Sequence, residues 1–409
     1  MGQSPGSCGR REGRCRPVEI TSRQIERAVD RGEMRFDYQP KVSFLTGGIS
    51  GAEALLRWRR DDGSEISPEN FVPQAEASGV VKDLTAAMFP LFLADVEAVS
   101  RRHPEQRIAF NVSALDLDAP RFILMLREAI DHGRIAVENL ELEVTEGAVV
   151  SSKASVLENL QRLVTEGVEL AMDDYGMGFS SLDTLHRLPF SSIKLDQSFV
   201  LRVLHSPKSA VLVKLSIAMA QMLGIRTVVE GVESKAIYDS LLHTGCSTAQ
   251  GFWISRPLSL ESYLELLDSG RTWPSSPIGL FRMAQLAHHW QERLLIDIVF
   301  AALKSNDPSV ELPLDFHLPE TECELGKWYS SVTHRFSGDP DFDSLEAPHR
   351  AMHRLCDEVF AALKTGDRRV ILDRLLHEIS SNSCLVSERL HRLETKALIR
   401  EARSKSERF

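Results

Sequence analysis

Acidic, amide and lysine side chains recur where short apolar segments end in the first two thirds of the chain. In order they are Glu53, Asn111, Glu143, Asp173 with Asp174, Lys194, Glu230 and Gln250. Carboxylate and amide oxygens are the ligands that Mg²⁺ and Mn²⁺ prefer, whereas carboxylates gathered without a cation repel one another. Two such ions can activate a water and stabilise an in-line phosphoryl displacement. The set therefore predicts a two-cation site for phosphodiester chemistry.

A single carboxylate at a strand end is more often a loop residue or a helix N-cap than a ligand. That interpretation does not account for the whole set. The adjacent pair Asp173-Asp174 is followed by the glycine-containing stretch YGMGFSSL, and Lys194 stands two residues before Asp196 on the next apolar segment. We therefore expect these side chains to act together.

The segments that carry these residues alternate with longer amphipathic helices, at intervals close to one β/α unit and with one unit skipped after Glu53. This spacing is typical of a (β/α)8 barrel of the TIM type, whose active site lies at the C-terminal ends of its strands. An open doubly wound sheet also alternates strand and helix, but its polar strand ends cluster near one switch point. The recurrence on almost every strand favours the barrel.

The pattern changes at Trp273, where WPSSP predicts a linker. Beyond it the apolar spacing is helical, which predicts an all-α four-helix bundle. The expected boundaries are a disordered leader over 1–20, the barrel over 21–272, the linker over 273–278, the bundle over 279–400 and a charged tail over 401–409.

The composition narrows the class of protein further. The 409 residues carry a formal net charge of -10, which argues against binding to a nucleic-acid polymer or an anionic membrane surface. The leader lacks the apolar core of a signal peptide, and no stretch reaches the roughly 20 apolar residues of a membrane span. Six scattered cysteines predict a reducing, cytoplasmic location.

Residues 22–270 resemble the EAL domain, a bacterial phosphodiesterase module for cyclic di-GMP. The motifs that carry the resemblance are YQPK, GAEALLRW, SPENFVPQAEASG, FNVSA, LEVTE, MDDYGMGFSSL, IKLDQSF, VVEGVE and QGFWISRP, all in family order. Tyr175, Met177, Phe179 and Val229 depart from the residues common at their positions, without removing a metal ligand.

The resemblance implies a role for each matching residue. The residues implied to bind two Mg²⁺ or Mn²⁺ ions are Glu53, Asn111, Glu143, Asp173, Asp174 and Glu230. Lys194 would hold or polarise the attacking water, and Glu230 would be a metal-site carboxylate or general base. Those implied to contact or surround the substrate are Gln39, Arg57, Asp196, Glu233 and Gln250. Glu146 would brace the loop after Asp174. A homodimer is implied as well.

A second constellation follows the linker. His349 and His353 share one face of a helix at i and i+4, and with Cys323 and one further imidazole they make a closed tetrahedral zinc set. Such a histidine pair is more often a surface feature. The combination CELGKW with LEAPHRAMH resembles the chemoreceptor zinc-binding (CZB) domain, in which a first-helix histidine completes the site.

The first-helix ligand is either His288 or His289, which lie about 100° apart on the helix. We lean to His289, because its i−3, i+7 and i+11 neighbours are all apolar. Cys323 as a zinc-bound thiolate would also be open to oxidation.

Together these features predict a phosphodiesterase that hydrolyses cyclic di-GMP to linear pGpG, regulated by zinc, and through Cys323 by oxidants, in the bundle. One alternative is a catalytically degenerate receptor that binds cyclic di-GMP without cleaving it. Another is a zinc sensor that acts through partner contacts. The sign of the zinc effect depends on how the bundle packs, which the sequence does not determine.

Overall fold

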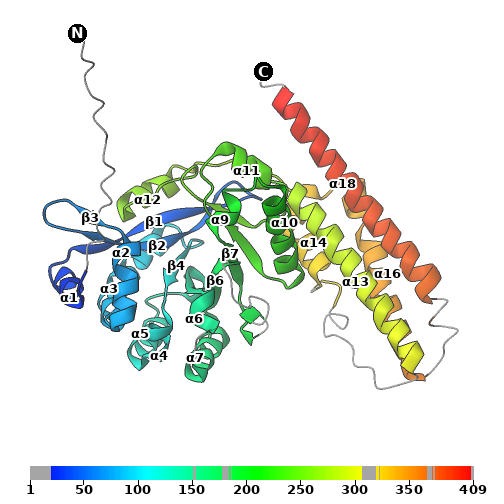
Figure 1. Cartoon of the computed structure of the whole chain (residues 1–409). Coiled ribbons are helices and arrows are strands. Elements are labelled where there is room, and N and C mark those ends of the chain that lie inside the picture. The colour runs from blue at the N-terminus through cyan, green and yellow to red at the C-terminus, as the bar shows by residue number, and fades with distance from the viewer. Residues whose placement is uncertain are drawn as a thin grey trace, which may run out of the picture.

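The computed structural model describes residues 20–150, 153–176, 184–185, 187–305, 319–321, 323–365, 371 and 374–406. The predicted leader lies outside this range except for the buried Ile20. Figure 1 shows two parts, a strand-lined barrel and a set of long helices beside it. Within the described ranges, none of the helices combines the length and the apolarity that a membrane crossing needs.

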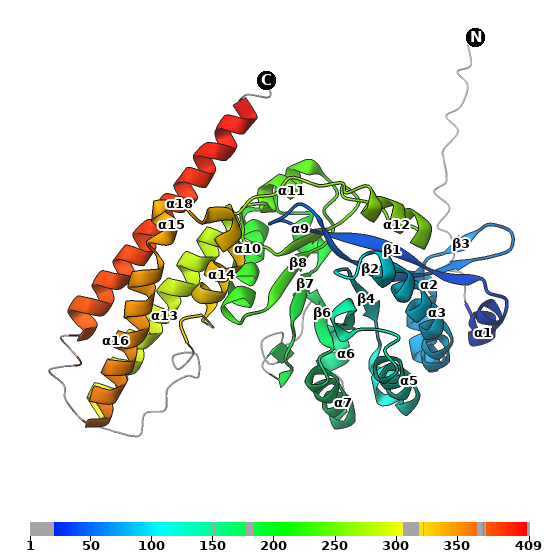
Figure 2. The same cartoon turned by 180° about the vertical axis from the view of Figure 1, so that it is seen from behind.

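Eight strands close into a barrel with helices outside it, as Figure 2 shows from behind. The strands are β1 (Met34–Ser43), β2 (Ile49–Arg59), β4 (Arg107–Asn111), β5 (Leu140–Thr145), β6 (Glu169–Tyr175), β7 (Ser192–Leu195), β8 (Arg226–Val229) and β9 (Thr248–Gln250). The order β1-β9-β8-β7-β6-β5-β4-β2 returns to β1 through the β1–β2 pair. The predicted barrel is confirmed.

Two features of the barrel differ from the regular eightfold repeat. β1 runs antiparallel to both neighbours, because the short turn 44–48 joins it directly to β2 and a turn of that length can only connect antiparallel strands. The long interval after Glu53 contains no skipped barrel strand. Residues 60–106 instead form the two-residue β3 (Glu65–Ile66), α2 (Pro68–Ser78) and α3 (Val81–Arg102).

The remaining helices of the barrel part cover its outside. They are α1 (Ser22–Asp30), α4 (Ala114–Asp118), α5 (Pro120–Asp131), η1 (Val137–Asn139), α6 (Glu146–Val150), α7 (Ala154–Thr165), α9 (Gln197–Val200), α10 (Pro207–Met222), α11 (Lys235–Leu241) and α12 (Leu260–Asp268). Apolar side chains of the strands and helices form one continuous core. An aromatic group around Phe110, which contacts Phe36, Phe89 and Phe92, fills the space between β4 and α3.

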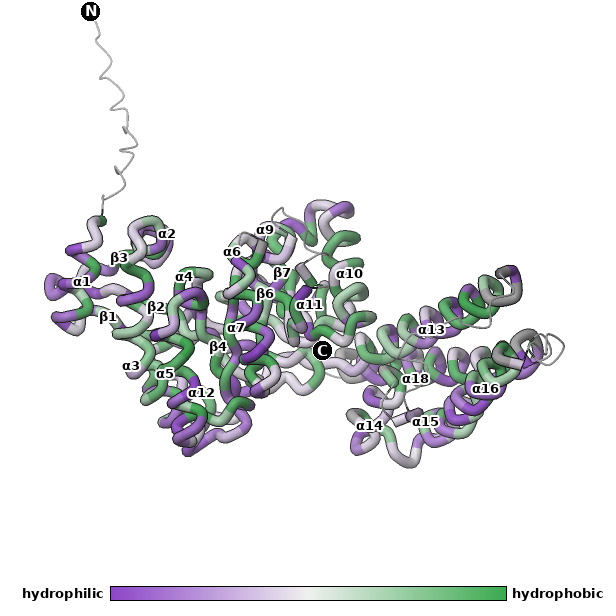
Figure 3. The backbone as a smooth tube through the Cα atoms, turned by 90° about the horizontal axis from the view of Figure 1, so that it is seen from below, coloured by the Kyte–Doolittle hydropathy of each residue, from purple (hydrophilic) through white to green (hydrophobic). Residues whose placement is uncertain are grey.

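The C-terminal part is helical, as predicted. Its elements are α13 (Ile278–Ser305), α14 (Glu324–Phe336), α15 (Pro340–Asp343), α16 (Glu346–Thr365), the π-helix η3 (Arg374–Ile379) and α18 (Ser380–Ser406). They enclose a second hydrophobic core, separate from that of the barrel. Figure 3 shows α13, α16 and α18 side by side, each with alternating hydrophobic and hydrophilic stretches.

The predicted linker is fixed to the barrel. Trp273 is buried, its backbone N–H donates to Gly47 O over 2.8 Å, and Tyr238 Oη donates to Pro274 O over 2.7 Å. At the other end, the predicted charged tail is helical as far as the described residues reach, because α18 continues to Ser406. Glu401 from this segment contacts His243 on the barrel side.

Candidate functional site

Lys194 lies at the centre of the barrel mouth, enclosed by carboxylates from four other segments. Its Nζ lies 2.6 Å from Glu143 Oε2 and 2.8 Å from Glu230 Oε1. Glu53 Oε2 at 3.1 Å and Asp173 Oδ1 at 3.2 Å complete the shell. Lys194 itself is 1% exposed. Residues predicted to act together from strands far apart in sequence therefore meet around one ammonium group.

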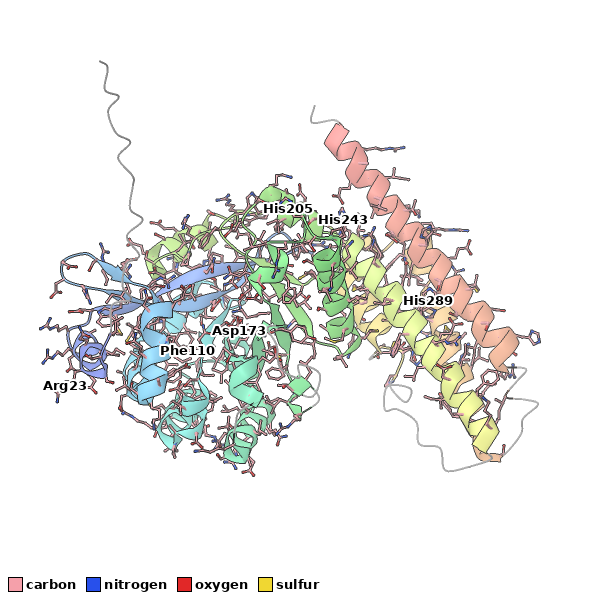
Figure 4. The ribbon with its side chains drawn as sticks, in the orientation of Figure 1. Arg23, Phe110, Asp173, His205, His243 and His289 are labelled. Carbon is pink, nitrogen blue, oxygen red and sulfur yellow. The ribbon has the colours of Figure 1, made fainter. Side chains whose placement is uncertain are left out.

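The strand register explains why these side chains converge. Glu53 on β2 is paired with Ala109 on β4, and Asn111 on β4 is paired with Glu143 on β5. Since side chains alternate along a strand, residues two apart point the same way, so Glu53, Asn111 and Glu143 all face the barrel mouth. Figure 4 shows Asp173 within the ring of strands.

Amide side chains fix the orientation of Glu53. Asn111 Nδ2 donates to Glu53 Oε1 over 2.8 Å, and Gln250 Nε2 donates to Glu53 Oε2 over 2.7 Å. Gln250 Nε2 also donates to Gln39 Oε1 over 3.1 Å. β1 brings Gln39 here because its antiparallel register pairs Gln39 with Glu53. Three predicted site residues thus form one hydrogen-bonded group with Glu53.

A second buried amine, Lys41, had no role in the predicted site. Its Nζ lies 2.8 Å from Glu141 Oε2 and 2.7 Å from Glu143 Oε1. Lys41 follows Gln39 by two positions, and Glu141 precedes Glu143 by two, so strand alternation alone placed both on the inward face. This alternation is the feature of the sequence from which Lys41 and Glu141 could have been predicted to face inward. Lys41 thus links Glu141 to Glu143, one of the candidate metal ligands.

The cluster carries more acid than base. Burial raises the pKa of Glu143 to about 8, and the Glu53 carboxylate adds to the rise. Burial likewise raises the pKa of Glu230 to about 7. Burial also disfavours the charged form of Glu53, but Lys194, Lys41 and the two amides outweigh it and lower the pKa of Glu53 to about 2. A divalent cation would replace the retained protons, so the donor set fits a hard metal.

The adjacent aspartates differ in conformation. Asp174 has a φ of 57°, which is unusual for a residue other than glycine, and its N–H donates to Asp173 Oδ1 over 2.9 Å. This backbone turns Asp174 away from the strand direction and leaves it exposed beside Asp173. Burial raises the pKa of Asp174, and the Asp173 and Asp196 carboxylates add to the rise. Asp174 is therefore close enough to both acids for their charges to act on it.

Asp196 also caps a helix. Its side chain accepts from Ser198 N over 2.9 Å at the start of α9, so the N-cap interpretation holds for this residue, and its role in the site stays a prediction. Glu233 does not join the cluster. It is exposed, and it makes no hydrogen bond or ion pair within the described part of the chain.

Arg57 lies on the same face of β2 as Glu53, two alternations further along. Its Nε donates to Asp37 Oδ2 over 3.2 Å, and Arg35 Nε donates to the other oxygen of Asp37 over 3.3 Å. Asp37, which the sequence did not single out, therefore holds Arg57 at the rim.

Glu146 begins α6 and is 3% exposed. It lies near Tyr175, whose pKa burial raises with a further contribution from Glu146. The loop that it was predicted to brace includes Met177 and Phe179, which lie outside the described residues. Its bracing role stays a prediction.

A cavity of about 440 Å³ opens from this cluster toward α2 and α3. Its inner end is formed by Glu53, Asn111, Glu143, Asp173 and Asp174. Its volume is in the range of small-molecule sites in proteins.

The bundle holds a second group of ligand-type side chains. Cys323 Sγ lies 3.2 Å from His349 Nε2, which in turn lies 3.2 Å from His353 Nε2. One ligand atom from each of the three lies within 4.8 Å of the others. Cys323 N-caps α14, and the two histidines project from α16. One thiol and two imidazoles this close fit three of the four positions of a zinc site.

The fourth candidate is His288, which corrects the lean toward His289. His288 is 2% exposed and lines a small cavity with His349 and His353, whereas the His289 side chain is 60% exposed. Ser383 on α18 lies 3.0 Å from His288 Nε2 through its hydroxyl oxygen. The apolar neighbours of His289 misled because α13 packs mainly against α18 along the face that carries His288.

Comparisons with known families cover both parts. The family model of the EAL domain matches residues 22–257, and that of the chemoreceptor zinc-binding domain matches residues 294–360. The second match begins after His288 and includes Cys323, His349 and His353.

Several curated relatives come from Pseudomonas aeruginosa. The cyclic di-GMP phosphodiesterase RocR is 36% identical over 63% of this chain and 66% of its own length. The cyclic di-GMP phosphodiesterase NbdA is 32% identical over 64% of this chain and 34% of its own length. The bifunctional diguanylate cyclase/cyclic di-GMP phosphodiesterase MucR is 32% identical over 59% of this chain and 35% of its own length. The chain thus spans less than two thirds of each relative.

Solved structures agree on the barrel. The phosphodiesterase PaMucR in complex with c-di-GMP has a TM-score of 0.56 at 32% identity, over 59% of this chain and 98% of that chain. The EAL enzyme Bd1971, in its form with cAMP and cyclic di-GMP bound, has a TM-score of 0.57 at 28% identity, over 60% of this chain and 68% of that chain.

Proposed function

Because the chain belongs to the EAL-domain family, we propose that its barrel hydrolyses cyclic di-GMP to linear pGpG with the help of two divalent cations. The observation that carries the proposal is the shell of four carboxylates around the buried Lys194. Every ligand type that the reaction needs is present, and the matched relatives named above are phosphodiesterases for this dinucleotide.

The cations, either Mg²⁺ or Mn²⁺, would be held by Glu53, Asn111, Glu143, Asp173, Asp174 and Glu230. When bound, the cations would lower the pKa of a water and stabilise the charge that develops on the phosphate. The excess of carboxylates over amines in the cluster supports this assignment, because it leaves negative charge that a hard cation neutralises.

Side chains of the chain position the reacting atoms. Lys194 stays protonated, because its carboxylate neighbours outweigh the effect of burial and keep its pKa well above the ordinary value. Its ammonium can donate to the attacking water or to a phosphate oxygen. Glu230, with a pKa near 7, is suited to accept the proton of that water. Oxygen from water then bonds to phosphorus, the bond to the 3′ oxygen breaks, and that oxygen takes up a proton.

Arg57 and Gln39 would contact the dinucleotide. The guanidinium of Arg57 offers a planar donor fork for a phosphate, and Asp37 engages its Nε only. Gln39 stands beside Glu53 through Gln250. Glu233 would act only if substrate drew its loop inward. Asp196 would adjoin the second ion through Asp174.

The test is product formation by the full chain incubated with cyclic di-GMP and Mg²⁺, followed by chromatography. Wild type should form pGpG, and Glu53→Ala should lower the rate by at least ~10²-fold, in line with the loss of a group that acts in the transition state. Glu265→Ala on α12, an exposed acid far from the mouth, is the matched control. Equal product from wild type and Glu53→Ala would leave the alternative of a binding-only receptor.

We further propose that zinc in the bundle, held by His288, Cys323, His349 and His353, modulates the barrel. Support comes from α13, which carries His288 and also meets the barrel. A Cβ atom on Gly279 would lie 2.5 Å from Gly245 N, and Arg282 Nη1 donates to His243 O over 3.2 Å. Figure 4 shows His243 where α13 approaches the barrel.

This junction leads directly into the site. The segment 243–247 continues as β9, whose Gln250 donates to Glu53. Any shift of α13 that zinc causes would therefore reach a metal-site carboxylate through a short, packed path. Glu401→Gln, which removes the ion pair with His243, should change the response of turnover to zinc while basal turnover stays within ~2-fold. An identical zinc response in wild type and Glu401→Gln would refute this route.

A homodimer is also proposed. α10 and its flanks expose large apolar side chains: Leu204, Val211, Leu212, Leu215 and Leu223. Exposed apolar surface of this kind is typical of an interface. Sedimentation of wild type and Leu215→Glu would test it, since a charge on that face should favour the monomer. A cytoplasmic location stays a prediction.

A further inference from the structure

α18 packs beside the proposed zinc site without supplying any of its four ligands. α13 carries His288, Cys323 caps α14, and α16 carries His349 and His353. α18 lies next to α13 and α16, as Figure 3 shows. It begins at Ser380, after the match to the family model of the zinc-binding domain has ended at residue 360. Any contribution of α18 to the site is therefore a property of this chain that the matched segment does not include.

The His288 ring is hydrogen-bonded to Ser383 on α18. Its Nε2 lies 3.0 Å from Ser383 Oγ and 3.3 Å from Ser383 O. Both residues are 2% exposed, so water hardly competes for these contacts. Within the described part of the chain, no hydrogen bond involves His288 Nδ1. The two ring nitrogens of His288 therefore have different surroundings.

The carbonyl oxygen of Ser383 determines which nitrogen of His288 carries the hydrogen. A neutral imidazole has one N–H and one lone pair, and a backbone carbonyl can only accept. The approach of Ser383 O to Nε2 is favourable only if Nε2 is the N–H, so the lone pair of His288 is on Nδ1. His349 and His353 differ in this respect. Their Nε2 atoms lie 3.2 Å apart, and that of His349 lies 3.2 Å from Cys323 Sγ.

We propose that Ser383 is a positioning residue of the zinc site, which holds His288 in its Nε2–H form so that Nδ1 of His288 and Nε2 of His349 and His353 are the ligand atoms. The inference rests on the proposed zinc site and adds to it a residue of α18. Ligating histidines commonly donate their second ring N–H to an oxygen, which fixes the ring and makes it a stronger ligand. Through Ser383, the position of α18 would then be tied to the metal.

The ligand atoms can be identified by NMR on the full chain, loaded with ¹¹³Cd²⁺ and labelled with ¹⁵N in its histidine rings. A coordinated nitrogen shows a one-bond coupling to the metal, and its couplings to the ring protons distinguish Nδ1 from Nε2. Wild type should show three coupled rings, two through Nε2 and one through Nδ1. The ring coupled through Nδ1 should disappear in His288→Gln and remain in His289→Gln.

Substitutions on α18 test Ser383 itself, with zinc affinity measured by competition with a chelator. Ser383→Ala should weaken zinc binding by roughly 10-fold, the lower end of the range for such partners, because the carbonyl remains. Ser383→Thr keeps a hydroxyl and should bind zinc within ~2-fold of wild type. Ser387→Ala, one turn further along α18, is the matched control and should keep the wild-type affinity, because the Ser387 hydroxyl has no hydrogen-bond partner among the described residues.

Coupling of the His288 ring through Nε2 would overturn the inference, as would equal zinc affinities for Ser383→Ala and Ser387→Ala. A metal coupled to His349 and His353 but not to His288 would overturn it as well. Absence of coupling to all three rings would refute the proposed zinc site itself. Whether the rings of His349 and His353 couple to the metal therefore distinguishes failure of this inference from failure of the site on which it rests.

Discussion

The two candidate metal sites are built on opposite electrostatic principles. In the barrel, charged carboxylates surround a buried cation, Lys194, and hydrogen bonds from amides fix their orientation. In the bundle, Cys323, His349 and His353 are packed against one another, with the Cys323 thiol and the His353 ring each in contact with the His349 ring. The barrel site is thus held together by an internal cation that can coexist with metal, whereas the bundle site brings neutral donors together and relies on packing.

The two sites differ in what they lose when their metal is removed. Without a divalent ion, Lys194 and Lys41 still offset part of the negative charge in the barrel. Without zinc, the bundle must bury imidazoles and a thiol whose contacts are with one another and with neighbouring backbone groups in place of the metal. Removal of metal should therefore abolish chemistry in the barrel but lower stability mainly in the bundle.

The largest effect should come from removing the internal cation. Lys194→Met leaves four carboxylates around an apolar side chain, which should destabilise the barrel by about 3–5 kcal/mol and abolish turnover. Added Mg²⁺ should recover part of the stability, because it replaces the lost positive charge. Thermal unfolding with and without Mg²⁺ measures this. A variant as stable as wild type in chelator would show that Lys194 does not balance the cluster.

Zinc removal should have the next largest effect, and only on the bundle. At free zinc 1,000 times the dissociation constant, binding contributes about 4 kcal/mol, so chelation should lower a bundle transition by that amount. Cys323→Ala should abolish the zinc-dependent shift, whereas Cys384→Ala, on the exposed side of α18, should keep it. A shift that survives Cys323→Ala would exclude this thiolate as a ligand.

In the metal-free protein, the stability of the two parts should change with pH in opposite directions. Burial lowers the pKa of His288 and of His349 to about 4, so as pH falls from about 6.5 to 4 the unfolded chain binds protons that the folded bundle does not, and the bundle loses stability. Glu143 and Glu230 have raised pKa values, so the barrel loses stability as pH rises from about 4.5 to 8.

Glu53 and Glu141 have pKa values lowered to about 2, so they change the stability of the barrel only below about pH 4.5. They therefore do not mask the loss of stability expected as pH rises to 8. Urea unfolding across pH 4.5–8 in chelator, with a separate probe for each part, measures both slopes, each at most about 1.4 kcal/mol per pH unit for one group. Slopes of the same sign in the two parts would contradict the comparison.

The smallest effect concerns adjacent residues on α13. His288→Ala should weaken zinc binding by ~10-fold or more, because His288 faces the cavity with His349 and His353. His289→Ala is the matched control and should leave zinc affinity within ~2-fold, because its side chain points outward. Competition with a chromophoric chelator gives both affinities, and the reverse order would restore His289 as the ligand.

The sequence could indicate which polar residues meet at the barrel mouth because that signal is local. Each strand carries its own polar residue at its C-terminal end, and strand register then brings Glu53, Asn111 and Glu143 together without further information. The partners that it missed, Lys41 and Glu141, follow from the same alternation but carry no strand-end signal.

The bundle was harder to predict for a physical reason. Which of two neighbouring histidines faces inward depends on the rotation of α13 about its axis, and that rotation is set by packing against α18. The contact of Trp273 with Gly47, which fixes the predicted linker to the barrel, could not be predicted for a similar reason, because it joins segments far apart in sequence. The antiparallel direction of β1 follows from the short turn that joins it to β2, and the count of strands from the sequence did not take that turn into account.

The most direct test of the central claim, that the carboxylate shell around Lys194 is a catalytic site, is a ³¹P NMR time course of cyclic di-GMP with the full chain and Mg²⁺. Hydrolysis to pGpG turns one of two equivalent phosphodiesters into a phosphomonoester, so wild type should show a monoester signal growing with an equal diester signal. Glu53→Ala should show only the starting diester over the same period. A wild-type sample that binds the dinucleotide yet never forms the monoester would contradict the account.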